Sequence, residues 1–198
     1  GMVTLASKER WLRGWSYKDH GKDWDAMFNR EHPPGPRLVH DTIGTNWRML
    51  EMQAVIGRIQ LKRMPQWHAA RQRNASAIFD AAANFSAVRV PEIPAHVTHG
   101  FYRAYIFARS EALKDGWSRD RMISELNERG IPVYHGSASE IYLEKAFDST
   151  PSRPATRLPI ARKLGETSIM FLVHPTLTET EISRTCSALQ DVLRLAQR

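Results

Sequence analysis

Tyr102-Arg103-Ala104-Tyr105-Ile106-Phe107-Ala108 is an aromatic and apolar run, and this composition predicts a β-strand. Ser118 then stands where it can cap a helix that ends at Gly130. Residues 131–134 predict a second, short strand at the edge of a sheet, because Pro132 has no N–H to donate. Strand and helix therefore alternate in this part of the chain.

The alternation continues to the C-terminus. Residues 169–173 predict a buried strand, and Thr178 with Glu181 predicts a capping box for the last helix. One face of that helix carries an apolar seam: Ile182, Cys186, Leu189, Leu193 and Ala196. The order β-α-β-α-β-α from residue 101 predicts a small α/β (α+β) sandwich, in which Cys186 is a core residue.

Upstream, residues 49–61 predict a helix that is apolar on nearly all sides. Such a helix is buried between layers or at a subunit interface. Met64-Pro65 predicts a break or a bend, with Pro65 as the first residue of a new helix that runs to about residue 84. A linker with short extended pieces is expected at residues 85–100.

The N-terminal segment carries weaker signals. Residues 2–5 form a short β-type run, and Ser7 predicts the cap of a short helix through Leu12. Residues 29–37 predict a loop, because prolines in this stretch fix φ and remove amide donors.

Composition narrows the class of protein. The 198 residues carry a net charge of +7, and residues 1–75 alone hold 13 basic and 7 acidic side chains. A single cysteine excludes an intrachain disulfide framework or a zinc ribbon and fits a reducing compartment. With no signal sequence and no apolar run near the roughly 18 residues of a membrane helix, we expect a soluble, cytoplasmic protein.

The residues alone name no reaction. Asp19-His20 with Asp23 fits either an acid–base pair or ordinary hydrogen bonding of a loop histidine. The histidines share no metal-ligand spacing, and no glycine-rich phosphate loop is present. Residues 134–140 include Ser137 and Ser139, which fit either a ligand contact or a turn that caps the next helix.

Four segments together resemble a known family: residues 16–21, 44–61, 130–147 and 172–178. Ser16-Tyr17-Lys18-Asp19-His20-Gly21 is similar to a basic R-x-H-G segment. Gly44-Thr45-Asn46-Trp47-Arg48-Met49, with the glutamine, alanine and glycine that follow it, is similar to a G-x-N-x-R-L/M motif. Leu172-Val173-His174-Pro175-Thr176-Leu177-Thr178 is similar to an LPxHPxLT signature. These motifs resemble the C-terminal part of DegT/StrS-type sugar aminotransferases, which are fold-type-I pyridoxal-phosphate enzymes of nucleotide-sugar biosynthesis.

The resemblance implies a fold and a division of the chain. Residues 1–64 would be a remnant of the large domain, with a dimer-contact loop and a buried helix, and residues 65–198 the small C-terminal α/β domain. In the family, a lysine forms a Schiff base with pyridoxal phosphate and transfers an amino group to a keto sugar. The residue that matches this lysine would lie upstream of residue 1, so the resemblance implies no catalytic residue here. It also implies that this chain alone neither holds pyridoxal phosphate nor transaminates. None of the seven lysines has the matching context: Lys8, Lys18, Lys22, Lys62, Lys114, Lys145 and Lys163.

The resemblance also implies site residues. Asn46 matches an asparagine that reaches the cofactor phosphate of the neighbouring subunit, and Arg48 lies beside it, since an amide and a guanidinium suit a phosphate dianion. The alternative is that Asn46 caps the following helix and Arg48 pairs with Glu51. Lys18 and His20 would line the same site, and His135 and Ser137 would contact the substrate. Because residues 134–140 depart from the family's common H-Y-x-P-L-H pattern, the sugar stays open.

Three functions are compatible with these observations. The first is part of a nucleotide-sugar aminotransferase that works as a homo-oligomer, expected to be a dimer, with no nucleic-acid, membrane or metal partner. The second is a non-catalytic interaction module that kept the dimer face. The third is a basic nucleic-acid-binding domain that uses residues 1–75.

Overall fold

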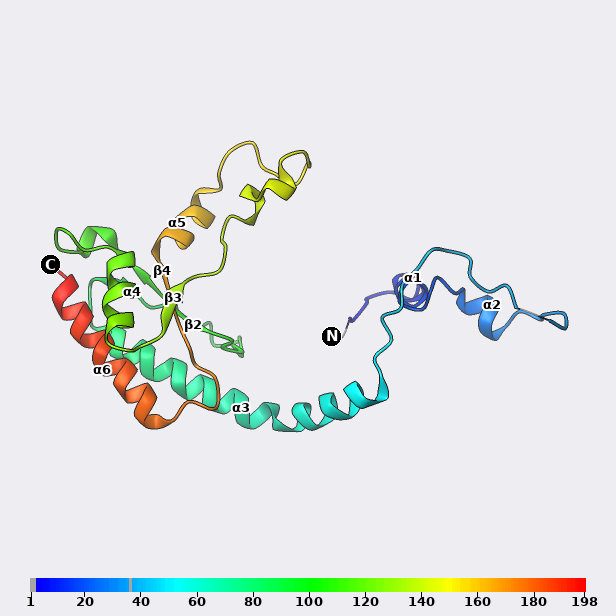
Figure 1. Cartoon of the computed structure of the whole chain (residues 1–198), viewed down its shortest axis with the longest axis horizontal. Helices are drawn as coiled ribbons and strands as arrows, with labels where there is room; N and C mark the ends of the chain where they lie inside the picture. The colour runs from blue at the N-terminus through cyan, green and yellow to red at the C-terminus, as the bar shows by residue number, and fades with distance from the viewer. Residues whose placement is uncertain (1–2, 36) are drawn as a thin grey trace. The chain divides into compact units, whose positions relative to one another are not determined.

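The computed structural model describes residues 3–35 and 37–198. It divides into two compact units, Gly1–Lys62 and Arg63–Arg198, whose elements are labelled in Figure 1. Gly1 and Met2, the first residue of the expected N-terminal strand, lie outside the described residues. Residues 3–5 form no strand, so that prediction is wrong for the part described.

The first unit begins with helix α1, Lys8–Lys18. The Ser7 hydroxyl accepts the N–H of Arg10, so the predicted cap is confirmed. The helix continues past Leu12, where the sequence predicted its end, because Trp11 and Trp15 both pack against Trp24, with ring centroids 4.9 Å away. Trp24 opens the short helix α2, Trp24–Phe28, which the sequence analysis did not predict.

Helix α3, Glu51–Ala83, runs through Pro65 without a break and contributes residues to both units. The predicted division into two helices at Pro65 is therefore wrong. Pro65 removes one N–H and crowds the preceding turn. Its side chain is exposed, however, so the carbonyl left without an N–H partner can be hydrated. The C-terminal part of α3 buries Ala75, Ile78 and two further alanines.

The second unit contains a four-stranded sheet in the order β1-β2-β4-β3. Its strands are β1 Val88–Arg89, β2 Ala104–Ala108, β3 Val133–His135 and β4 Ser168–Phe171. All neighbouring strands are antiparallel, with Ile106 opposite Ile169 and Val133 opposite Phe171. The short strand that contains Val133 lies at an edge, as its proline predicts.

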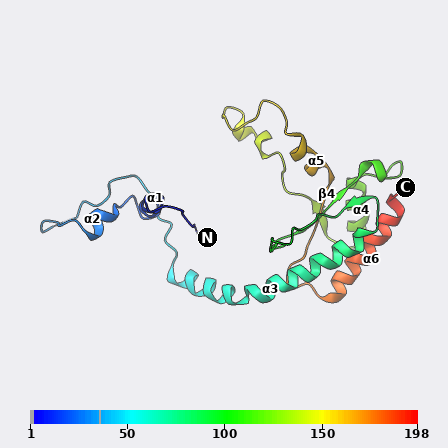
Figure 2. The same cartoon turned by 180° about the vertical axis from the view of Figure 1, so that it is seen from behind.

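Helices α4 Arg119–Glu128, α5 Pro159–Thr167 and α6 Glu179–Ala196 complete the fold, with short 3-10 turns at Ser110–Ala112, Ile141–Leu143 and Lys145–Phe147. Figures 1 and 2 both show α6 alongside the C-terminal half of α3. The core lies between the sheet and the helices α3, α4 and α6, and it includes Ile78, Ile106, Leu126, Phe171 and Leu189. This mixed helix and sheet arrangement confirms the predicted α/β (α+β) class.

Local capping signals in this unit are also confirmed. The Ser118 hydroxyl accepts the N–H of Arg121, and Thr178 with Glu181 forms the capping box of α6. Cys186 is half-buried against the core, and its thiol donates to the carbonyl of Ala77 at 3.4 Å. Across the described ranges, no helix has the length and apolar character needed to cross a bilayer.

Candidate functional site

The end of α1 and the segment before α3 are joined by backbone hydrogen bonds in the first unit. The N–H groups of Thr45 and Trp47 donate to the carbonyls of Tyr17 and Lys18, at 2.7 and 3.0 Å. The N–H of His20 returns a bond to the carbonyl of Thr45 at 3.0 Å. Lys18, His20 and Asn46 therefore lie on two paired segments, although 25 or more residues separate Asn46 from the other two.

Two glycines allow this pairing to be close. A Cβ on Gly21 would stand 1.7 Å from the carbonyl oxygen of Thr42, and one on Gly44 would stand 2.2 Å from the nitrogen of Gly21. Gly21 also has a φ of 77°, and His20 before it has a φ of 61°. These left-handed conformations turn the chain sharply after α1 and bring it back beside residues 40–47.

Asn46 bends the chain locally. Its side-chain Oδ1 accepts the backbone N–H of Arg48 at 3.3 Å, which is an Asx turn. Helix α3 begins at Glu51, so the interpretation of Asn46 as the cap of that helix is wrong. The residue is exposed, and its Nδ2 amide makes no hydrogen bond to residues 3–35 or 37–198.

The guanidinium of Arg48 pairs with Asp19 rather than with Glu51. Its Nη2 donates to Oδ2 of Asp19 at 2.6 Å, and Lys22 Nζ lies 3.5 Å from the other oxygen. Asp19 is only 2 % exposed, whereas the Arg48 side chain is 59 % exposed. A buried carboxylate thus holds an arginine that still reaches solvent.

The electrostatics of this cluster favour an ionised Asp19. Burial raises the pKa of its carboxyl, but the positive charges of Lys22, Arg48 and Lys18, and a hydrogen bond from Lys22, together lower the pKa below its usual value. The interpretation of Asp19-His20-Asp23 as an acid–base group is not supported by these contacts. The Asp19 carboxylate serves two cations, and Asp23 accepts the N–H of Ala26 at 2.7 Å as the cap of α2.

Four of the predicted site residues thus lie on these two hydrogen-bonded segments: Lys18, His20, Asn46 and Arg48. The Lys18 ammonium lies 5.4 Å from the centre of the Trp15 ring, and the His20 side chain is exposed. Between them, the paired segments offer two cationic side chains, an amide whose Nδ2 is unengaged and an imidazole. Such a donor set suits a small anion, and a phosphate monoester in particular.

The other two predicted residues, His135 and Ser137, lie in the second unit, at and just after the end of β3. His135 Nε2 is 3.4 Å from Asp120 Oδ1, and the Ser137 hydroxyl is 3.4 Å from that of Tyr105. Both side chains are exposed. A ligand can therefore reach both polar groups. Their contacts with Asp120 and Tyr105 are long, so these neighbours hold them only weakly.

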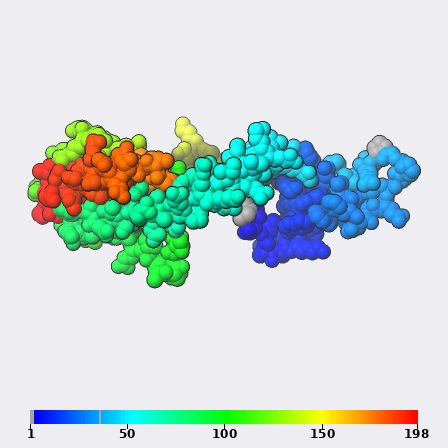
Figure 3. Space-filling view, turned by 90° about the horizontal axis from the view of Figure 1, so that it is seen from below, coloured from blue at the N-terminus to red at the C-terminus, as the bar shows by residue number. Residues whose placement is uncertain are grey.

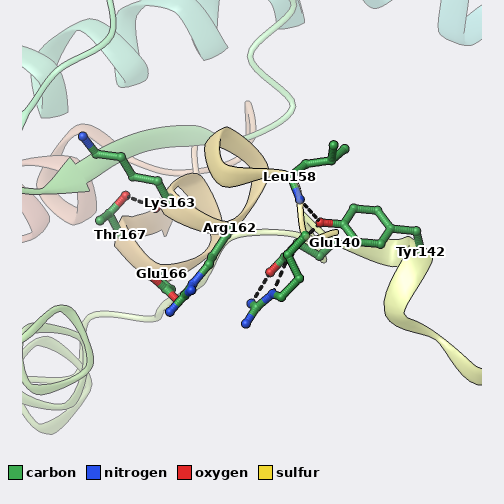
Figure 4. Close-up of polar contacts among 8 residues, drawn as sticks. Glu140, Tyr142, Leu158, Arg162, Lys163, Glu166 and Thr167 are labelled. Atoms are coloured by element: carbon green, nitrogen blue, oxygen red, sulfur yellow. Dashed lines mark hydrogen bonds and ion pairs between the residues drawn. The ribbon is translucent and has the colours of Figure 1, made fainter. Parts of the chain in front are cut away.

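A polar network in the segment between β3 and α5 was not predicted from the sequence. The Tyr142 hydroxyl donates to Glu140 Oε1 at 2.6 Å and accepts the N–H of Leu158 at 2.9 Å (Figure 4). Arg157 donates to both oxygens of Glu140, with Nε at 3.0 Å from Oε1. Hydrogen bonds from Arg157 and then Tyr142 lower the pKa of Glu140 to about 2. No local sequence motif predicts this network, since Arg157 and Leu158 are 17 and 16 residues from Glu140 and Tyr142, their partners.

The sequence and the structure were both compared with those of known proteins, and the matches agree on one family. The sequence matches the DegT/DnrJ/EryC1/StrS aminotransferase family over residues 1–190. It is 31% identical to GDP-perosamine synthase of Caulobacter vibrioides, over 98% of this chain and 48% of that protein. It is 28% identical to a UDP-N-acetyl-3-dehydro-alpha-D-glucosamine 3-aminotransferase of Acidithiobacillus ferrooxidans, over 98% of this chain and 46% of that protein.

The structure is similar to the X-ray structure of an aminotransferase from Psychrobacter cryohalolentis. The TM-score is 0.86 at 50% identity, and the match covers 96% of this chain and 50% of that one. The chain therefore spans about half the length of the relatives that it matches.

Proposed function

The chain belongs to the DegT/DnrJ/EryC1/StrS aminotransferase family, and we propose that it forms part of a pyridoxal-phosphate-dependent aminotransferase that acts on keto nucleotide sugars. The relatives named above support this substrate class, since one is a GDP-perosamine synthase and another acts on a UDP-linked dehydro sugar. Within the proposed enzyme, residues 1–64 belong to the large domain and residues 65–198 form the small C-terminal domain.

The observation that carries the proposal is the cluster of Lys18, His20, Asn46 and Arg48. A pyridoxal phosphate molecule fits this donor set through its phosphate, because a dianion can accept from the Asn46 amide and from the free donors of Arg48. When bound, the cofactor supplies a pyridine ring that withdraws electrons from the substrate carbon. Asn46 and Arg48 would hold and orient this phosphate, and Lys18, whose charge already acts on Asp19, would add positive potential to the site.

The same proposal gives roles to the predicted residues of the second unit and to the lysines. We propose that His135 and Ser137 contact the sugar, since both are exposed polar groups at the end of β3. No lysine of this chain stands in the sequence context of the family's Schiff-base lysine, so we propose that the chain alone does not transaminate. Mixed with pyridoxal phosphate, it should give no imine absorbance, and an imine band abolished by mutation of an internal lysine would overturn this point.

The N-terminal part of α3 supports a homo-oligomer, which we propose is a dimer. Met52, Val55, Ile56, Ile59 and Leu61 are all exposed, although burial of apolar surface stabilises proteins. Figure 3 shows the surface of this segment in cyan. A second copy of the chain would cover these side chains and, by family resemblance, would bring Asn46 to the cofactor of its neighbour.

Phosphate binding tests the site directly. The chain alone is not expected to hold the whole cofactor, but its phosphate-binding residues should still respond to phosphate. In an NMR titration of the whole chain, pyridoxal phosphate and inorganic phosphate should shift the side-chain signals of Asn46 and Arg48 in a saturable manner, and pyridoxal without its phosphate should not. Asn46→Ala should weaken this binding, whereas Asn29→Ala, which changes an exposed asparagine of the same unit, should leave it unchanged. Equal responses to pyridoxal and pyridoxal phosphate would contradict the proposal.

A further inference from the structure

Asp19 is a charged residue in a buried position at the C-terminal end of α1. Burial of an ionised carboxylate is costly unless cations and hydrogen bonds compensate it. Both of its oxygens are engaged, one by Lys22 and the other by Arg48. Neither the cap of α1 nor the core of the unit requires a carboxylate at position 19. The pairing with Arg48 does require one.

The contact with Arg48 is long-range in the sequence, across 29 residues. It coincides with a backbone bridge between Asp19 and Asn46. Asp19 therefore contacts the 46–48 segment twice, once through its main chain and once through its side chain. The glycines Gly21 and Gly44 bring the two segments so close that this geometry has little freedom.

Arg48 is held by one end only. Its Nη2 donates to Asp19, while the side chain as a whole is 59 % exposed and makes no second hydrogen bond to residues 3–35 or 37–198. Its other N–H groups are therefore available to solvent or to an anion. A free arginine side chain loses rotamer entropy when it binds an anion. A guanidinium already fixed by a buried carboxylate has lost much of that entropy beforehand.

We propose that Asp19 is a positioning residue, which orients Arg48 and the Asn46 segment so that they bind a phosphate monoester. The inference rests on the function proposed above, in which these two residues hold the phosphate of pyridoxal phosphate. Asp19 itself does not touch the phosphate. It acts through the guanidinium of Arg48 and through the backbone bridge to Asn46.

A positioning role and a purely electrostatic role of Asp19 predict opposite changes in phosphate affinity for one substitution. Asp19→Asn removes a negative charge close to the site, so charge alone would strengthen the binding of an anion. If Asp19 positions Arg48, the same change frees the guanidinium and weakens the binding of inorganic phosphate and pyridoxal phosphate by about three- to tenfold. Glu31→Gln makes the same change of charge at an exposed position of the first unit and should not weaken binding.

The order of the Arg48 side chain gives a second readout that needs no ligand. The heteronuclear NOE of its Nε–H should be high in the wild-type chain and should fall in Asp19→Asn. Combined with Arg48→Lys, Asp19→Asn should cause little further loss of phosphate binding, because the two residues act as one unit. Asp19→Glu keeps the charge and lengthens the side chain, so it should also weaken binding. It serves as the test if Asp19→Asn fails to fold.

The outcomes separate the two proposals. If the wild-type chain binds neither phosphate probe, the proposed function fails at this site. If the NOE of Arg48 still falls in the Asp19 variants, Asp19 orients Arg48 but the pair does not bind phosphate. If wild type binds phosphate, and Asp19→Asn or Asp19→Glu binds it equally or more tightly, the positioning role is wrong while the proposed function stands. An NOE that is unchanged in a folded Asp19 variant overturns the inference directly.

Discussion

Gly21 and Gly44 approach each other so closely that a Cβ on Gly44 would stand 2.2 Å from the backbone nitrogen of Gly21. Real Cβ contacts do not reach this distance, so any larger residue at position 44 must move the chain. The pairing of the two segments that carry Lys18, His20, Asn46 and Arg48 therefore depends on the absence of a side chain at this point.

We predict that Gly44→Ala destabilises the first unit by about 1–3 kcal/mol, the usual cost of overpacking a tight site. Urea unfolding followed by tryptophan fluorescence measures this change, because Trp11, Trp15, Trp24 and Trp47 all lie in this unit. Gly57→Ala is the control, since a Cβ there meets nothing within 4 Å on helix α3. It should stabilise by about 0.5–1 kcal/mol through helix propensity. A neutral Gly44→Ala would contradict the close approach.

Pro65 offers a test of the continuity of α3. Proline in a helix interior removes a hydrogen bond and clashes with the preceding turn, at a cost of about 3 kcal/mol. Pro65 lies inside α3 and is exposed, so Pro65→Ala should raise the free energy of unfolding by about 1–3 kcal/mol and increase the helical circular dichroism signal. The exposed neighbour substitution Gln66→Ala should change stability little. A loss of helix signal in Pro65→Ala would mean that the proline is required for the native path of the chain.

The elements that the sequence predicted well are those with local signals. Ser118 and the Thr178–Glu181 pair act within one helical turn, and the strand at Ala104–Ala108 has an aromatic and apolar composition. The predicted break at Pro65 was wrong because the helical pattern on both sides of the proline outweighs its low helix propensity. The site was less predictable. Asn46 and Arg48 came from resemblance, and the role of Asp19 depends on a contact across 29 residues that no local pattern encodes.

The Glu140 network should respond to acid. Because Arg157 and Tyr142 lower the pKa of Glu140 from 4.5 to about 2, their interaction stabilises the segment fully above pH 4.5 and is lost as the pH falls towards 2. An NMR pH titration should show the Arg157 Nε–H and Leu158 N–H signals moving with a midpoint near 2. Glu140→Gln should abolish this transition, and Glu144→Gln, at an exposed position nearby, should leave it in place. A midpoint at an ordinary carboxyl value would mean that the network does not persist in solution.

The exposed apolar part of α3 should hold two copies of the chain together. Ile56 is 56% exposed, and a charge placed there would have to be desolvated in the dimer. Ile56→Glu should therefore weaken self-association by about tenfold or more in sedimentation equilibrium. Ile160→Glu makes the same chemical change at an exposed position of α5, in the second unit, and should leave association unchanged. A wild-type chain that stays monomeric at high concentration, or an Ile56→Glu variant that associates as tightly as wild type, would show that this segment is not the contact between copies.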